Sequence, residues 1–173
     1  MDEENSTSNI FLISMLSLFP WNEEHGVFSS NGIPPELSSK SRFSIICNLS
    51  RTGQAGTHFI AIIRRDSVIL YLDPLALYIE LNEDISNFID NCNVEKVSKM
   101  DQAIQHPRSA YCAYFCLLLL LHFNPEVSVE GAEKFSETKL KINDCICINN
   151  IVKYIDQNYI ILMLNSLIRV AQR

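Results

Sequence analysis

The sequence is short of positive charge. Its 173 residues include 14 lysines and arginines against 20 aspartates and glutamates, for a net charge of −6. DNA-binding proteins gain affinity by neutralising phosphates with basic side chains, so this balance argues against DNA as the default partner. With 47% apolar and 20% charged residues, the composition is that of a globular protein and excludes a disordered chain. The length suits one unit, so we expect residues 1–173 to form a single domain.

Long hydrophobic runs are also missing. The apolar block at residues 111–123 is thirteen residues long and ends near His122, whereas a membrane span needs about 20 residues. The amino-terminal segment MDEENSTSN is acidic, whereas a secretory signal starts with positive charge. We therefore expect a soluble intracellular protein without a membrane partner.

None of the six cysteines has the two-residue gap of a zinc-binding pair. Cys145 and Cys147 are two positions apart, and Cys112 and Cys116 are four apart. Without a secretory signal, reduced thiols are a better expectation than three disulfides. The sequence thus predicts neither a metal nor any other required cofactor.

Hydrophobic patterning predicts an α+β domain, and no repeat or low-complexity tract divides the chain. Runs rich in β-branched residues predict strands at residues 43–48, 58–64, 68–73 and 94–98. Apolar residues at helical spacing predict helices at residues 10–19, 84–91 and 149–169. A short polar turn joins the second and third of these strands, which predicts an antiparallel hairpin.

Residues 109–123 are expected to form a buried central helix on which a small mixed or antiparallel sheet packs. Ser109 suits the N-cap position, and Pro125 follows the end of the apolar run. A helix that is apolar on all sides must be buried on all sides. The other helices would then be peripheral.

Cys112 falls at the third position of this predicted helix, close to its amino-terminal end. Unpaired backbone N–H groups and the helix dipole favour a thiolate there, and the thiolate is the nucleophilic form of cysteine. The alternative is a small buried cysteine without chemistry, which is what we expect of Cys116, one turn deeper in the helix.

His58 and Asp73 would supply a base and its orienting acid. They stand at the first and last positions of the predicted hairpin, so they meet at its open end, away from the turn. A carboxylate beside a histidine orients the ring and stabilises the imidazolium formed when a thiol loses its proton. Taken singly, His58 could be an exposed residue without a role, and Asp73 with Pro74 could simply end a strand.

Gln105 lies seven residues before Cys112. Its side-chain amide can donate a hydrogen bond to an oxyanion, with the Cys112 backbone N–H as second donor. Pro107 restricts the loop between them. The alternative is a solvated loop residue.

With these residues in place, the sequence resembles the adenovirus endopeptidase (adenain-like) family of cysteine proteases. Its relatives in Maverick/Polinton elements and adintoviruses are the closest in character. The matching stretches are GTHFIAI at His58, LYLDPLA at Asp73, IQHPRSAYCAYFC with Gln105 and Cys112, and the upstream GVFSSNGIP. The resemblance spans residues 26–123 and leaves residues 124–173 unmatched.

The resemblance implies a Ulp/adenain-like fold and a cysteine endopeptidase that cleaves capsid and core precursors during virion maturation. It implies cleavage after small residues, in the host nucleus or the virion. The family usually has Trp after the catalytic histidine and Gly after the cysteine, where this chain has Phe59 and Ala113. Adenovirus enzymes use a peptide and DNA as activators. We do not carry these over, because the chain is acidic and has only Cys92 near the position of the peptide-binding cysteine.

Two alternatives stay open. Proteases for ubiquitin-like modifiers, such as deSUMOylases and deubiquitinases, share the order His, Asp, Gln, Cys. They usually keep Trp after His and Gly after Cys, and they lack the GVFSSNGIP stretch. The second alternative is a catalytically silent binding module of the same fold, which the presence of all four groups argues against.

Overall fold

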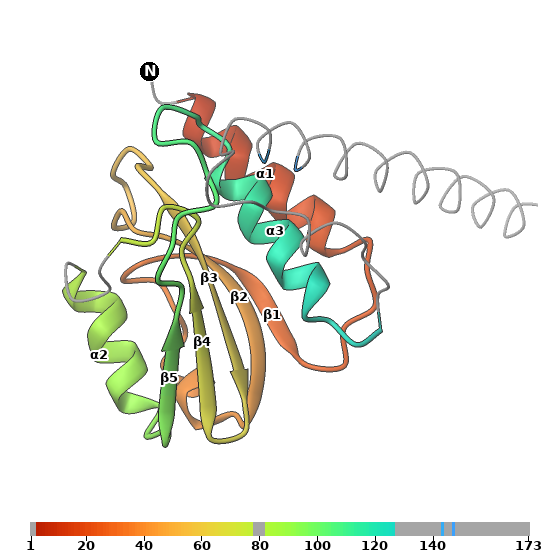
Figure 1. Cartoon of the computed structure of the whole chain (residues 1–173), viewed down its shortest axis with the longest axis vertical. Helices are drawn as coiled ribbons and strands as arrows, with labels where there is room; N and C mark the ends of the chain where they lie inside the picture. Colours follow the sequence, from red (N-terminus) through yellow and green to blue (C-terminus); the bar gives the residue numbers. More distant parts are fainter. Residues whose placement is uncertain (1–2, 78–81, 127–142, 144–146, 148–173) are drawn as a thin grey trace, which may run out of the picture.

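A five-stranded mixed sheet and three α-helices make up the α+β structure, a computed structural model that describes residues 3–77, 82–126, 143 and 147 (Figure 1). The helices are α1 (Glu3–Leu16), α2 (Glu83–Asn91), α3 (Cys112–His122) and the short 3-10 helix η1 (Pro35–Ser39). The strands are β1 (Glu24–Ser29), β2 (Arg42–Asn48), β3 (Phe59–Arg65), β4 (Val68–Leu72) and β5 (Lys96–Lys99).

The strands lie in the order β1-β2-β3-β4-β5. The central pairs β2–β3 and β3–β4 are antiparallel, whereas the edge strands β1 and β5 run parallel to their neighbours. The predicted hairpin is therefore confirmed, and its turn contains Asp66 in the left-handed region (φ 53°). The strands are shorter at the open end than predicted, so His58 and Asp73 lie just outside them.

Helices cover both faces of the sheet, with α1 and α3 on one side and α2 on the other (Figure 1). Alternate residues of β3 take part in the two cores: Phe59, Ala61 and Ile63 pack with α1 and α3, and Ile60 and Ile62 pack with α2. A strand buried on both faces must be apolar at successive positions. Each fully buried Ile or Leu stabilises the fold by about 1.5–3 kcal/mol.

Helix α3 is buried along most of its length, as predicted. Its inward residues include a run of five leucines and lie against α1, β2 and β3. The predicted helix start is wrong, because the N-cap is Tyr111 and Cys112 is the first helical residue. Ser109 instead closes a turn, where its N–H donates to the His106 carbonyl (2.9 Å). In the described residues no helix combines the length and apolar character needed to cross a bilayer.

Other differences lie mainly at the amino-terminal side. Helix α1 begins and ends earlier than the predicted helix at residues 10–19. Strand β1, which contains His25, was not predicted. This edge strand is half exposed and lacks the alternation that marks a strand. Strand β5 and helix α2 are close to their predicted ranges, and the predicted helix at residues 149–169 lies outside the described residues.

Candidate active site

The turn after β4 holds the Asp73 carboxylate by both oxygens. Oδ1 accepts a hydrogen bond from the Leu75 N–H (2.8 Å), and Oδ2 accepts one from the Leu77 N–H (3.1 Å). The Asp73 carbonyl accepts a third bond, from the Ala76 N–H (2.9 Å). Only 1% of Asp73 is exposed. Backbone donors thus fix the orientation of a buried acid.

His58 lies against this acid, as the sequence predicts. The register pairs Ala61 with Leu72, and its continuation places His58 diagonally across from Asp73 on the same side of the ladder. The distance from His58 Nε2 to Asp73 Oδ1 is 2.6 Å, and the histidine is 8% exposed. Nδ1 is therefore the ring nitrogen left to exchange a proton with Cys112.

The environment of His58 favours its protonated form. Burial alone lowers the pKa of an imidazole. Hydrogen bonds to Asp73 and Cys112, and the negative charge on both groups, outweigh burial and raise the pKa of His58 from 6.5 to about 9. The ring is therefore suited to accept and hold the proton of a neighbouring thiol.

Cys112 differs from the other cysteines in the described part of the chain. Its side chain is half buried at the first position of α3, within hydrogen-bond reach of His58. Cys47, Cys92 and Cys116 are buried, and burial raises the pKa of each of these thiols. The start of a helix also leaves its first N–H groups without intrahelical partners. The Cys112 thiol thus lies beside the unpaired backbone N–H groups at the start of α3.

Gln105 is a buried residue, 1% exposed, and the alternative of a solvated loop residue is wrong. Its Nε2 donates to the Ser109 carbonyl (2.9 Å). An amide nitrogen carries two hydrogens, so one remains for a further acceptor. Its Oε1 has no hydrogen-bond partner among the described residues.

A cleft of about 900 Å³ brings His58, Gln105 and Cys112 to one surface. Aromatic and aliphatic side chains form most of the rest of its wall, and they include Phe11, Phe59, Leu75, Leu77, Tyr111 and Tyr114. Among the described residues, no Asp, Glu, Lys or Arg side chain lines the cleft. The cleft can therefore admit an uncharged, extended peptide beside the thiol.

Phe59 is named by the sequence reasoning, but the other aromatic side chains of the wall are missed: Phe11, Tyr111 and Tyr114. Tyr114 packs against Phe11 of α1 and Tyr111, with ring centroids 5.5 Å and 6.0 Å apart. The spacing of Tyr111 and Tyr114 around Cys112 could have placed both on one helix surface. Phe11 gives no such local signal, because it reaches the cleft only through the packing of α1 on α3.

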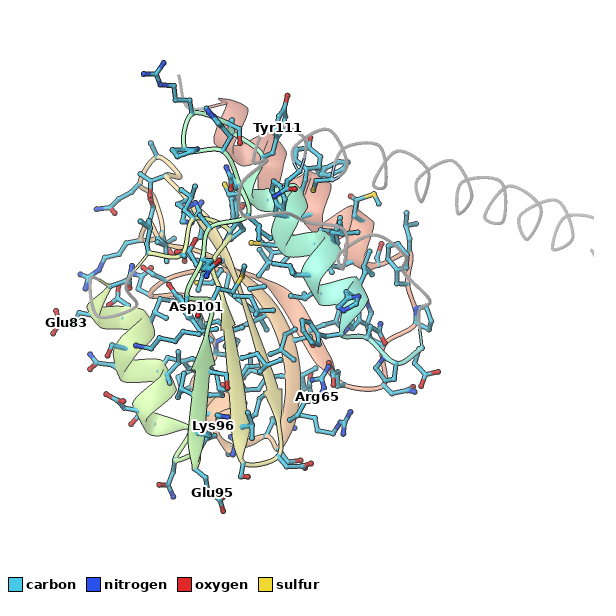
Figure 2. All side chains as sticks on the ribbon, viewed as in Figure 1. Arg65, Glu83, Glu95, Lys96, Asp101 and Tyr111 are labelled. Carbon is cyan, nitrogen blue, oxygen red and sulfur yellow. The ribbon has the colours of Figure 1, made fainter. Side chains whose placement is uncertain are left out.

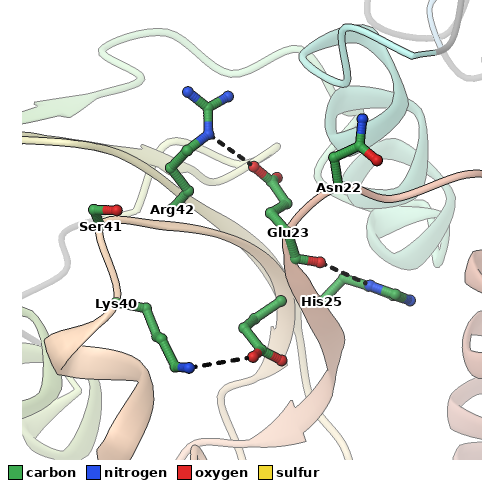
Figure 3. A pocket seen from close by; sticks show the side chains of 7 residues that line it. Asn22, Glu23, His25, Lys40, Ser41 and Arg42 are labelled. Carbon is green, nitrogen blue, oxygen red and sulfur yellow. Dashed lines mark hydrogen bonds and ion pairs between the residues drawn. The ribbon is translucent and has the colours of Figure 1, made fainter.

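A second hollow, of about 550 Å³, lies between the start of β1 and the start of β2 (Figure 3). Ion pairs brace it: Glu23 with Arg42 (3.8 Å) and Glu24 with Lys40 (3.4 Å). His25 bonds through Nδ1 to the Glu23 carbonyl (3.2 Å). The two ion pairs join the start of β1 to the start of β2.

No protein-family model matches this chain, and no curated protein matches it. Within the described residues, no group of three or more His, Cys, Asp or Glu side chains is placed to hold a metal ion. The groups that the site offers for chemistry are those of Cys112, His58, Asp73 and Gln105.

Proposed function

We propose that this chain is a cysteine endopeptidase with Cys112 as nucleophile and His58 as general base. The observation that carries the proposal is the buried contact between His58 Nε2 and Asp73 Oδ1 (2.6 Å), with Cys112 close enough to the same ring to raise its pKa. A nucleophile, a base and an orienting acid in this order form the arrangement of a catalytic triad.

Each group has a defined role in the proposed reaction. The Cys112 thiol gives its proton to His58 Nδ1, and the sulfur adds to the carbonyl carbon of the scissile peptide bond. The resulting oxyanion accepts hydrogen bonds from the Cys112 N–H and the second Nε2 hydrogen of Gln105. His58 then protonates the leaving amine, and the C–N bond breaks to leave a thioester. Water, deprotonated by His58, hydrolyses that thioester and restores the thiol.

The finer proposal is an adenain-like protease of viral or transposon origin that cleaves capsid and core precursors during particle maturation, in the host nucleus or virion. The order of His58, Asp73, Gln105 and Cys112 and the spacing of the last two support it. The arrangement of a mixed sheet with the nucleophile at the start of a buried helix is compatible with a Ulp/adenain-like fold.

The test is to incubate the purified chain with the neighbouring gene products of its genome and to map new amino termini by mass spectrometry. A ubiquitin-like modifier precursor serves as a second substrate class. Cys112→Ala should abolish cleavage, whereas Cys116→Ala, which removes a buried thiol one helical turn away, should retain it. Cleavage that persists in Cys112→Ala would contradict the proposal.

A further inference from the structure

Asn143 is a buried residue that reaches the segment before Gln105. It is fully buried, 0% exposed, and its Nδ2 donates a hydrogen bond of 2.8 Å to the Ile104 carbonyl. Cys147, four residues further along, packs in the same core as α3. The part of the chain beyond α3 thus contributes a directed polar contact beside the candidate active site.

The contact acts on one peptide group. The carbonyl of the Ile104–Gln105 peptide accepts from Asn143, and its N–H, which belongs to Gln105, donates to the Pro74 carbonyl (3.0 Å). The Ile104 N–H also donates to the Pro74 carbonyl (2.9 Å). Both polar ends of the peptide plane are therefore held, and the backbone of Gln105 is joined to the turn that follows Asp73.

The orientation of this plane determines where the Gln105 amide lies. The side chain is further anchored by its bond to the Ser109 carbonyl (2.9 Å), which directs one Nε2 hydrogen and leaves the other to the cleft. Catalytic donors are sensitive to position, and a displacement of about 1 Å can cost about 10²-fold in rate. If this peptide group loses one of its two hydrogen bonds, it can tilt and move the Gln105 side-chain amide away from the cleft.

We propose that Asn143 is a positioning residue for the oxyanion hole, acting through the Ile104–Gln105 peptide group. The inference rests on the proposed cysteine protease function. It assigns a role to a residue beyond position 123, where the resemblance to the adenain-like family ends. Asn143 acts without touching the substrate.

Asn124 offers a matched control. It is 3% exposed, and its Nδ2 donates to the Pro20 carbonyl (2.9 Å), beyond the opposite end of α3 from Cys112. Asn143→Leu and Asn124→Leu each remove a buried amide whose Nδ2 donates to a backbone carbonyl, so both should lower the melting temperature. Only Asn143→Leu should lower kcat, by about 10- to 100-fold with little change in KM, because only it affects a transition-state donor.

Two further measurements separate positioning from a general loss of structure. Alkylation of Cys112 by iodoacetamide forms no oxyanion, so its rate should be the same in Asn143→Leu and the parent. In a Gln105→Ala background, Asn143→Leu should cause no further loss of kcat, since the group it positions is gone. Hydrogen exchange of the Gln105 backbone N–H should be faster in Asn143→Leu, and this measurement does not depend on enzyme activity.

The outcomes distinguish the two levels of the proposal. A parent chain that neither cleaves peptides nor binds a peptide aldehyde, which would form a hemithioacetal with Cys112, overturns the proposed function and the positioning role with it. An active parent whose Asn143→Leu variant keeps its kcat, or loses kcat and alkylation equally, overturns the positioning role alone.

Discussion

At the scale of single residues, the thiols of the described part of the chain differ in accessibility and surroundings. We expect Cys112 to be alkylated first under mild iodoacetamide treatment, because it is half exposed beside His58, whereas burial raises the pKa of Cys47, Cys92 and Cys116. Mass mapping of the labelled peptides measures this. Earlier labelling of Cys47 or Cys92 would show that the helix start does not activate the thiol.

In the proposed reaction, Gln105 stabilises charge that exists only in the transition state. Gln105→Ala should lower kcat by roughly 10²–10³, about 3–4 kcal/mol, with little change in KM. Alkylation of Cys112 in this variant should stay close to that of the parent. If Gln105 were only a brace for the loop through Ser109, cleavage, alkylation and melting temperature would fall together.

Asp73 is expected to orient His58 without accepting its proton. Asp73→Asn should leave the fold intact and reduce turnover by a few orders of magnitude, because the ring loses the carboxylate that stabilises its charged form. Steady-state kinetics and circular dichroism on the same preparation measure the two effects. An unchanged rate would mean that Asp73 is only the terminator of β4.

The same ion pair gives stability a defined pH dependence. His58 has its pKa raised from 6.5 to about 9, so its contribution to the free energy of unfolding is complete below pH 6.5 and is lost as pH rises through 9. The loss is at most about 3 kcal/mol. Urea unfolding of the parent chain on both sides of this window measures it, and in a Cys112→Ala background, which removes the contribution of the thiol to the raised pKa, the loss should be smaller. Asp73→Asn should reduce the change in the free energy of unfolding across this pH window. An equal pH dependence with and without Asp73 would show that the His58–Asp73 pair is not its cause.

At the scale of elements, the turn after β4 holds a strained residue. Ala76 has φ 51°, a left-handed conformation that favours glycine. Ala76→Gly should raise the free energy of unfolding by about 1 kcal/mol. Ala61→Gly, in the middle of buried β3, should lower it, because a strand interior has no such strain and loses a buried methyl group. Chemical denaturation measures both, and a loss of stability in Ala76→Gly would mean that the turn is not strained.

The elements that local pattern predicted are those whose signals are contained in a few adjacent residues. The hairpin of β3 and β4 follows from two apolar runs and a short turn, and α3 follows from a continuous apolar run. The start of α3 was mispredicted because Ser109 is both a good N-cap residue and a good turn residue. The turn is the role found in the structure, where the Ser109 N–H donates to the His106 carbonyl and the Ser109 carbonyl accepts from Gln105 Nε2.

At the scale of the whole molecule, no lysine or arginine of the described residues lines the cleft. Arg65 lies at the end of the sheet away from Tyr111 (Figure 2). It pairs with Glu23 (2.9 Å), and Arg64 donates to the Ser38 carbonyl (2.6 Å). These two arginines therefore form no patch with Arg108, which precedes α3.

We accordingly expect activity without DNA. Duplex DNA added at low salt should leave kcat and KM unchanged, because an acidic chain with net charge −6 gains little from phosphate neutralisation. A fluorogenic peptide assay with and without DNA measures this. A DNA-driven increase in rate that weakens steeply with salt would overturn the expectation.

The sequence alone determined the parts of the site that depend on short-range spacing. Gln105 and Cys112 are joined by one short loop, and His58 and Asp73 by one hairpin whose register follows from its turn. Hairpin geometry therefore predicts the contact between His58 and Asp73 that the structure contains. The apolar character of α3 similarly required its burial.

Only the tertiary structure decided the contacts that join distant parts of the chain. Phe11 reaches the cleft because α1 packs on α3, and Asn143 reaches the Ile104 carbonyl from 39 residues away. A side-chain amide can bond to any exposed carbonyl, so neither its partner nor its role is encoded in neighbouring residues. The tertiary fold selects that partner, because burial makes an unpaired amide costly.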